Sequence, residues 1–447
     1  FVILFFNQDI SPCCIFISSM VKLTSRKVKI LEKYIVRGTG PLSGQVRVSG
    51  AKNAALPIMC ATILCDGEVI LEDMPNLKDV EILSEVLRGL GLVIDRLDEH
   101  TYKFDARNIT NTTTGPELMS KMRASFCVMG PLLSRMGHTA NALPGGCAIG
   151  TRPIDLHLKG FKALGADVVT EHGMVTAECE KLVGTEVYLD FPSVGATQNI
   201  MMAATLAEGE TIIDNAACEP EIVDLANFLN KMGADVRGAG TSIVKIKGVD
   251  KLHGCRHQII PDRIEAGTFM IAAAAAGGNI VVENVITSHM RPVIAKLREA
   301  GVIIHENGDS INVIADKKIS AFDIKTLPYP GMPTDMQAQF MALATISEGT
   351  SVIIETVFEN RFMHVDELNR MGANIRIDGK NAIVQGVKKL RPAKVKATDL
   401  RCGAALIIAG LTVDGETEIS DIYHIDRGYE HLVEKFKGIG ADIRREG

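Results

Sequence analysis

One helix-to-strand unit recurs six times along this 447-residue chain. In each copy a glycine follows an amphipathic stretch and precedes a β-rich run, as expected where a helix ends in the left-handed conformation. A second glycine ends an earlier and more apolar helix in every copy. The first set is Gly91, Gly165, Gly233, Gly301, Gly372 and Gly440, and the second is Gly67, Gly137, Gly209, Gly278, Gly349 and Gly415. We therefore predict an α/β fold of six units, each with a helix, a strand, a second helix and further strands.

Composition limits what such a chain can bind. It is 46% hydrophobic and 23% charged, which is ordinary for a soluble globular protein of two or more domains. A net charge of -6 argues against general affinity for nucleic acid or anionic membranes. The ten cysteines form no CxxC pair and no His/Cys cluster at metal-ligand spacing. We expect a cytoplasmic protein without a metal, a nucleic-acid partner or a membrane partner.

The first 30 residues differ from the rest of the chain. Their two apolar bursts are interrupted by polar residues and by Pro12, so they are too short to span a bilayer, and no basic start of a signal peptide precedes them. The chain does not begin with methionine. We expect residues 1–30 to be a disordered extension outside the repeats, translated from upstream of a true start at Met20 or nearer Leu31.

A loop insertion distinguishes the second unit. Its two glycines are 28 positions apart, against 23 to 25 in the other units, and the interval contains Gly145, Gly146 and Cys147. An insertion in one loop of a regular repeat is a common source of function. Free cysteines are mostly small buried hydrophobes. Cys147 has loop-forming neighbours instead, and Arg152 with a helix start close by would lower the pKa of its thiol.

Charged residues recur at one position of the repeat, at the start of the first helix. The six equivalents are Lys52, Arg123, Gly195, Arg263, Asp335 and Arg401. A cation there opposes the helix dipole, whereas a phosphate or carboxylate bound at the helix start would make it favourable. The loops before the second helices carry Arg152, Arg291, Arg361 and Arg427. This pattern predicts a cleft for an anionic substrate, in which Asp335 is either a helix cap or a base.

The segments that carry these residues resemble those of the enolpyruvyl transferases, in particular of members whose acceptor is a UDP-linked amino sugar. The resemblance covers residue 33 to the end of the chain. The segments are Ser49–Ala55, Met122–Ser125, Ala142–Leu156, Pro333–Phe340, Glu359–His364, Thr398–Arg401 and His424–Glu430.

The resemblance implies two inside-out, barrel-like α/β domains of three repeats each, related by a pseudo-threefold axis. Their helices lie inside, their sheets face solvent, and the cleft lies between them. One domain would comprise residues 31–51 and 260–447 with the general base and arginines, and the other would comprise residues 52–259 with the mobile Cys147 loop.

The implied reaction transfers the enolpyruvyl group of phosphoenolpyruvate to the 3′-hydroxyl of UDP-N-acetylglucosamine and releases phosphate, by addition and elimination through a tetrahedral intermediate. It opens bacterial peptidoglycan synthesis and needs no cofactor. By resemblance, Cys147 is the proton donor and can form a covalent adduct, and Asp335 is the base. The implied phosphoenolpyruvate ligands are Lys52, Arg152 and Arg427 at the phosphate, Arg361 and Arg401 at the carboxylate, and Asn53. Those implied for the sugar nucleotide are Arg123, Arg152, Pro153, Ile154, Asp155, Leu156, Ser193, Val194, Gly195, Asp335 and Val357.

Two alternatives differ from this in testable ways. The sister enzymes that use shikimate 3-phosphate share the scaffold, but they lack the Gly-Gly-Cys147 loop and the segment from Arg152 to Leu156. A repeat-built ring around DNA would instead need many lysines on its inner helices, which here are nearly all apolar. We expect a monomer.

Overall fold

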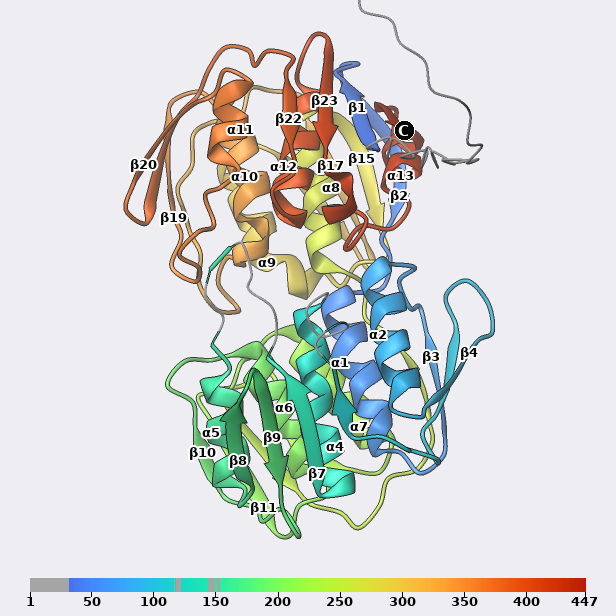
Figure 1. Ribbon diagram of the computed structural model, residues 1–447. Coiled ribbons are helices and arrows are strands. Elements are labelled where there is room, and N and C mark those ends of the chain that lie inside the picture. Colours follow the sequence, from blue (N-terminus) through green and yellow to red (C-terminus); the bar gives the residue numbers. More distant parts are fainter. Residues whose placement is uncertain (1–31, 116, 118–121, 144–148, 151–152) are drawn as a thin grey trace, which may run out of the picture. The chain divides into compact units, whose positions relative to one another are not determined.

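The computed structural model describes residues 32–115, 117, 122–143, 149–150 and 153–447, which belong to one compact unit, Glu32–Gly447 (Figure 1). The expectations for residues 1–30, Cys147 and Arg152 lie outside these residues. Of Arg123 only the backbone is described.

The first helix of each repeat is buried. In α8, every residue from Ile264 to Ala274 is buried. A helix that is apolar all round belongs in a core, which is why these six helices lie inside. They are α1 (Lys52–Ala61), α4 (Met129–Met136), α6 (Val194–Ala204), α8 (Arg263–Ala276), α10 (Gln337–Ala344) and α12 (Leu400–Leu411). The short turns η1 (Thr62–Leu64), η2 (Arg123–Val128) and η4 (Thr334–Met336) adjoin α1, α4 and α10.

The second helix of each repeat is amphipathic, with one buried face. These helices are α2 (Lys78–Gly89), α5 (Asp155–Ala163), α7 (Pro220–Lys231), α9 (Arg291–Glu299), α11 (Val365–Arg370) and α13 (Leu432–Gly438), with η3 (Thr287–Met290) and η5 (Ile422–His424) before α9 and α13. The glycine predicted after each of them has a positive φ, between 88° at Gly440 and 107° at Gly91. The predicted helix ends are therefore confirmed. In the other glycine set only Gly137 caps its helix. The helix ends predicted at Gly67, Gly209, Gly349 and Gly415 are wrong because those helices already end at Thr62, Thr205, Thr345 and Thr412, and Gly278 is the first residue of a strand.

Six four-stranded sheets complete the repeats, and three of them are built from residues 68–258. Their strand orders are β14-β3-β5-β4, β6-β7-β9-β8 and β10-β11-β13-β12. The strands are β3 (Glu68–Glu72), β4 (Val93–Arg96), β5 (Tyr102–Asp105), β6 (Thr113–Thr114), β7 (His138–Ala142), β8 (Asp167–Glu171), β9 (Met174–Glu178), β10 (Glu186–Tyr188), β11 (Glu210–Asp214), β12 (Asp235–Arg237), β13 (Ile243–Lys247) and β14 (Arg256–Gln258).

The other three sheets combine the first strands of the chain with the last 170 or so residues. Their orders are β22-β23-β1-β24, β16-β17-β15-β2 and β18-β19-β21-β20. The strands are β1 (Lys33–Arg37), β2 (Leu42–Arg47), β15 (Gly278–Glu283), β16 (Ile303–Asn307), β17 (Ser310–Ala315), β18 (Ile324–Lys325), β19 (Thr350–Ile354), β20 (Asn374–Asp378), β21 (Asn381–Gln385), β22 (Lys394–Lys396), β23 (Glu416–Ser420) and β24 (Asp442–Glu446).

Strand exchange links the repeats in two groups of three. In each sheet one strand from a neighbouring repeat pairs in parallel with the repeat's first strand, as β6 does with β7 and β14 with β3. In the other group the N-terminal segment closes the circle, because β2 pairs in parallel with β15 while β1 lies between β23 and β24. The expected three-plus-three arrangement is present, as six separate sheets.

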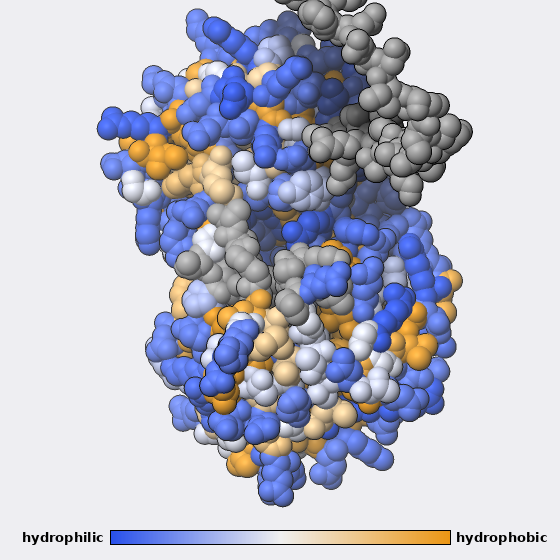
Figure 2. Space-filling model, in the orientation of Figure 1, coloured by the Kyte–Doolittle hydropathy of each residue, from blue (hydrophilic) through white to orange (hydrophobic). Residues whose placement is uncertain are grey.

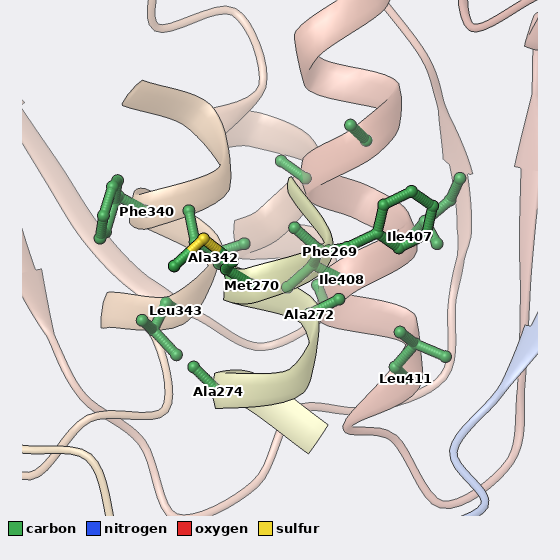
Figure 3. Packing of buried hydrophobic residues seen from close by; sticks show 14 of the residues in the cluster. Phe269, Met270, Ala272, Ala274, Phe340, Ala342, Leu343, Ile407, Ile408 and Leu411 are labelled. Atoms are coloured by element: carbon green, nitrogen blue, oxygen red, sulfur yellow. The ribbon is translucent and has the colours of Figure 1, made fainter. Parts of the chain in front are cut away.

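Two hydrophobic cores fill these groups. One contains residues between Tyr34 and Val48 and between Ile264 and Ile443, and the other extends from Ala51 to Ile259. Figure 3 shows side chains of α8, α10 and α12, among them Phe269, Leu343 and Ile407, packing in the first core. The division supports our proposal of one domain from residues 31–51 and 260–447 and another from residues 52–259.

The chain passes between the two cores twice, and the two passages are hydrogen-bonded to each other. The amide of Ala51 donates to the carbonyl of Ile260 at 2.7 Å, and the amide of Asp262 donates to the carbonyl of Ser49 at 2.9 Å. Helices α1 and α8 begin directly after these passages. Their first residues, Lys52 and Arg263, are therefore fixed beside the boundary between the cores.

The face in Figure 2 is mostly hydrophilic, with apolar residues in small groups. This fits sheets whose strands alternate buried and exposed side chains, such as β13. Among the described residues, no helix has both the length and the apolar character needed to cross a membrane.

Candidate active site

A cavity of about 800 Å³ is lined by residues of both groups of repeats. Its walls include the starts of α5 and α6, the turn η4, and the segment between β19 and α11. Nine residues predicted to bind a sugar nucleotide line it, together with Asn53. The nine are Pro153, Ile154, Asp155, Leu156, Ser193, Val194, Gly195, Asp335 and Val357.

The N-termini of α5 and α6 contribute to this cavity. Helix α5 begins at Asp155, and α6 begins at Val194 after Ser193, whose side-chain oxygen accepts a hydrogen bond from the amide of Ala196 at 3.3 Å. Free backbone amides and the positive end of the helix dipole make such positions favourable for anions. Gly195 permits the close packing here, because a Cβ at this position would lie 3.2 Å from the ring of His157.

Asp335 lines the cavity and accepts hydrogen bonds from two buried arginines. Its Oδ1 accepts a hydrogen bond from Nη2 of Arg361 at 2.8 Å, and its Oδ2 accepts one from Nη2 of Arg401 at 3.1 Å. Arg361 and Arg401 are almost fully buried, while the Asp335 side chain is 28% exposed. Because charge-assisted bonds of this kind are strong, the three side chains hold one another in place.

Arg401 also contacts a buried polar group formed by Tyr429 and by side chains of the central helices α8 and α10. Its Nη1 lies 3.4 Å from the hydroxyl of Tyr429, which is 2.9 Å from Oγ1 of Thr268, and Gln339 donates to that same Oγ1 at 3.2 Å. Burial alone would lower the pKa of Arg401, but Asp335 and Tyr429 raise it above its ordinary value. The guanidinium therefore stays charged inside the protein.

A second ion-pair group centres on Asp79, near the start of α2. Its Oδ2 lies 3.2 Å from Nζ of Lys52, and its Oδ1 accepts a hydrogen bond from Nε of Arg427 at 2.8 Å. Burial lowers the pKa of Lys52, Asp79 opposes this, and the charges of Arg401 and Arg427 lower it further. Lys52 and Arg427 are held together by the carboxylate of Asp79 that they share.

Asp79 was not predicted. An acid in the first turn of an amphipathic helix is common because it complements the helix dipole. No local pattern distinguishes Asp79 from other such acids. Its burial, at 2% exposure, is visible only in the fold.

A third group lies on the cavity wall at the start of α7. Arg263 donates two hydrogen bonds to Glu221, from Nε at 3.0 Å and from Nη2 at 3.3 Å. Neighbouring Glu219 is a cavity residue with a buried Oε2 that has no hydrogen-bond partner among the described residues, and burial raises the pKa of its carboxyl. Neither glutamate was predicted.

Ile149 and Gly150, which follow Cys147 in the sequence, contact the segment between β19 and α11. The amide of Asn360 donates to the carbonyl of Ile149 at 3.1 Å. A Cβ on Gly150 would lie 2.2 Å from a carboxylate oxygen of Glu359, so only glycine fits there without movement. The described end of the predicted loop is therefore fixed next to Val357, Arg361 and the cavity.

The other cysteines contrast with the role predicted for Cys147. Burial raises the pKa of six described thiols, so these are poor nucleophiles at neutral pH. They are Cys60, Cys65, Cys179, Cys218, Cys255 and Cys402.

The predicted residues thus form two connected sets. One set lines the cavity, and the other consists of Lys52, Arg361, Arg401 and Arg427, which are tied by ion pairs to Asp79 and Asp335. Arg291 begins α9 with an exposed side chain and is not among the described residues that line the cavity. Cations held by carboxylates next to helix N-termini can bind a ligand with several anionic groups.

Known proteins resemble this chain over most of its length. Residues 36–436 match the family described as EPSP synthase (3-phosphoshikimate 1-carboxyvinyltransferase). UDP-N-acetylglucosamine 1-carboxyvinyltransferase of Finegoldia magna is 61% identical over 90% of this chain and 96% of its own. UDP-N-acetylglucosamine 1-carboxyvinyltransferase 1 of Caldanaerobacter subterraneus subsp. tengcongensis is 59% identical over 93% of this chain and 99% of its own.

Solved structures agree in fold. The enolpyruvyl transferase NikO from Streptomyces tendae matches with a TM-score of 0.84 and 25% identity, covering 93% of this chain and 99% of its own. EPSP synthase from Acinetobacter baumannii matches with a TM-score of 0.73 and 18% identity, covering 93% of this chain and 100% of its own.

Proposed function

Because this chain belongs to the EPSP synthase family of enolpyruvyl transferases, we propose that it transfers the enolpyruvyl group of phosphoenolpyruvate to the 3′-hydroxyl of UDP-N-acetylglucosamine and releases phosphate. The observation that carries the proposal is the cavity at the starts of α5 and α6, which contains Asp335 of the arginine group. The nucleotide would lie in this cavity, and the smaller substrate with its phosphate and carboxylate would lie beside it, at the cations paired with Asp335 and Asp79.

The two ion-pair groups match the two ends of phosphoenolpyruvate. Lys52 and Arg427 would hold the phosphate with Arg152, and Arg361 and Arg401 would hold the carboxylate. In the free protein, the carboxylates of Asp79 and Asp335 occupy these cations. Substrate anions would replace them, with Asn53 completing the pocket.

The sugar nucleotide would lie along the cavity wall. Its pyrophosphate suits the N-termini of α5 and α6, where backbone amides favour anions. Arg123 and Arg152 would add positive charge, and the wall from Pro153 to Leu156, together with Ser193 to Gly195 and Val357, would position the uridine and sugar. This brings the sugar hydroxyl to Asp335.

The reaction needs an acid and a base together. Cys147 would protonate C3 of phosphoenolpyruvate while the 3′-oxygen bonds to C2 and its proton passes to Asp335. The tetrahedral intermediate would then lose a proton from C3 as the C2–O bond to phosphate breaks, leaving the enol ether. Replacement of Asp335 by the substrate carboxylate at Arg361 and Arg401 would free its oxygens to accept the proton. Alternatively, the Cys147 thiol would add across the C2–C3 double bond, with its sulfur bonding to C2 and its proton passing to C3.

This reaction would open bacterial peptidoglycan synthesis, and a cytoplasmic location is part of the proposal. The scattered single cysteines support a reducing compartment. That the chain acts as a monomer remains a prediction.

Use of shikimate 3-phosphate is the competing function. The similarity to the EPSP synthase structure, at 18% identity, extends to the fold alone. The DNA-encircling ring is disfavoured because the inner helices are buried in apolar cores and present no basic surface.

Acceptor-dependent phosphate release tests the proposal. Purified protein is given phosphoenolpyruvate with UDP-N-acetylglucosamine, with shikimate 3-phosphate, or with neither. We expect rapid release with the sugar nucleotide and background release in the other two reactions. Equal or faster release with shikimate 3-phosphate would refute the proposal.

A further inference from the structure

A cluster of two glutamates and two histidines lies outside the substrate cavity. Glu99 and His100 belong to the turn between β4 and β5, and Glu430 and His431 directly precede α13. The turn lies between strands of one core, while α13 packs in the other. A possible ligand atom from each of Glu99, His100 and Glu430 lies within 4.8 Å of the other two.

Glu430 is the unusual member of this cluster. Its side chain is 2% exposed, and neither carboxylate oxygen has a hydrogen-bond partner among the described residues. The nitrogens Nδ1 of His100 and Nε2 of His431 lie 3.6 and 3.8 Å from Oε1, which is beyond hydrogen-bonding distance. Buried carboxylates are costly without a partner, and they are normally paired or bound to a metal.

The spacing of the cluster suits a small metal ion. Bonds of about 2.0–2.2 Å place neighbouring ligands of a tetrahedral zinc site roughly 3.3–3.6 Å apart. Here Nε2 of His431 lies 3.1 Å from Oε1 of Glu99 and 3.8 Å from Oε1 of Glu430, and Nε2 of His100 lies 4.0 Å from Oε2 of Glu99. Two of these separations are longer than ligand spacing, so a bound ion would draw the exposed side chains of Glu99 and His431 and the half-buried His100 together.

The orientation of His100 supports the same role. Its Nδ1 lies 3.1 Å from the carbonyl oxygen of Met74. A carbonyl only accepts hydrogen bonds, so Nδ1 carries the proton and Nε2 keeps its lone pair. Histidine ligands characteristically donate their second nitrogen to a backbone carbonyl in this way, which fixes the ring and its tautomer.

Charge balance favours a divalent cation. With both imidazoles neutral, the two glutamates carry two negative charges that a divalent ion neutralises. Imidazole together with carboxylate is a ligand set that zinc accepts readily. We propose that Glu99, His100, Glu430 and His431 form a Zn²⁺ site that fastens the turn before β5 to the segment before α13.

This site is separate from the transferase chemistry, which needs no metal. It would stabilise the contact between the two cores, because two of its ligands come from each side. This cluster was not predicted from the sequence, because more than 300 residues separate the Glu99–His100 pair from the Glu430–His431 pair.

Titration calorimetry with ZnCl₂ tests the site. The full-length protein is stripped with EDTA, and its accessible thiols are alkylated so that cysteines do not take up the ion. We expect one Zn²⁺ per chain in the wild type, and a rise in melting temperature on adding zinc. In His100→Ala and Glu430→Gln the affinity should fall by at least roughly 100-fold, since even outer-shell changes cost 10–100-fold. Both variants should lose the thermal shift.

Control variants guard against indirect effects. His305→Ala removes an exposed histidine of β16 and should bind zinc like the wild type. Should Glu430→Gln fail to fold, the exposed variants Glu99→Gln and His431→Asn carry the test, and asparagine tolerates the positive φ of 47° at position 431. Absence of binding to the wild type, or equal affinity in the wild type and the cluster variants, would overturn the proposal.

Discussion

Asp335 and Asp79 each hold a pair of cations of the candidate site in place in the free protein. Each carboxylate bridges two cations in the free protein, so positive charges that would otherwise repel one another are held close together. In the proposed function, substrate anions would displace these carboxylates from the cations. Substitutions among their partners should therefore affect turnover more than folding wherever the partner is accessible.

Arg427 offers that test. Its side chain is 35% exposed. Arg427→Ala should lower kcat/KM by about 10²–10³, as expected when one charge-assisted contact to a developing anion is lost. Arg256→Ala, at a surface pair with Glu72, is the matched control and should leave turnover unchanged. Steady-state kinetics and thermal unfolding measure both effects, and a variant unfolded at assay temperature would indicate a structural role.

Cys147 is tested by two substitutions with opposite expectations. Cys147→Ser should be nearly inactive because a hydroxyl is far too weak an acid. Cys147→Asp should retain activity if the site raises the pKa of the new carboxyl enough for it to act as the acid. Wild-type Cys147 should also react with an epoxide that carries a phosphonate, and the Asp variant should resist. Full activity in Cys147→Ser, or label on Cys127 or Cys402, would remove this thiol from the mechanism.

His364 makes stability depend on pH. Burial lowers its pKa well below 6.5, with Asp399 opposing and Arg361 adding to the shift. As the pH falls below 6.5, the unfolded chain binds a proton at this position that the folded protein does not. Stability therefore rises with pH through this range and is lost on acidification.

Urea denaturation at pH 7.5 and pH 5 measures this effect. His364→Gln should lose less stability between the two pH values than the wild type, while His305→Ala, at an exposed position, should behave like the wild type. An unchanged pH dependence in His364→Gln would contradict the assignment.

At the scale of elements, close packing of α5 against α6 sets where their N-termini meet the cavity. Gly160 of α5 allows this approach, because a Cβ there would lie 2.3 Å from the Cγ1 and Cδ1 atoms of Ile200 in α6. Only the Cβ of Ile200, at 3.6 Å, is at an ordinary contact distance. The helix spacing therefore depends on a small residue opposite a branched one.

A double-mutant cycle tests this packing. Gly160→Ala should destabilise the protein by about 1–3 kcal/mol through overpacking, and Ile200→Ala by about 2–5 kcal/mol through the cavity it leaves. The double variant should be more stable than the sum of the two effects implies, because the new methyl group enters the vacated space. Simple additivity in urea denaturation would contradict the close contact.

The elements also indicate what a sequence can and cannot predict. The helix-ending glycines were found because a positive φ restricts residue choice at a fixed period. The insertion of β1 between β23 and β24 carries no such local signal, since pairing between strands about 380 to 410 residues apart leaves the composition of each unchanged. The same applies to Asp79 and Glu219, whose burial depends on neighbours from other repeats.

At the scale of the whole molecule, the repeats form two groups of three, each with its own hydrophobic core, and the candidate cavity lies where the two groups meet. Cavity residues come from five of the six repeats, so no single repeat contains the site. The paired passages at Ala51–Ile260 and Ser49–Asp262 fix the starts of α1 and α8 beside it. We infer that this arrangement joins phosphoenolpyruvate to the 3′-oxygen of UDP-N-acetylglucosamine.

Identification of the product tests that claim most directly. The protein is incubated with both substrates, phosphate is counted, and the nucleotide product is examined by mass spectrometry and by NMR correlation through the new ether bond. We expect one enolpyruvyl group on the 3′-oxygen for each phosphate released. Release of phosphate with an unmodified nucleotide, or a product substituted on another oxygen, would contradict the account.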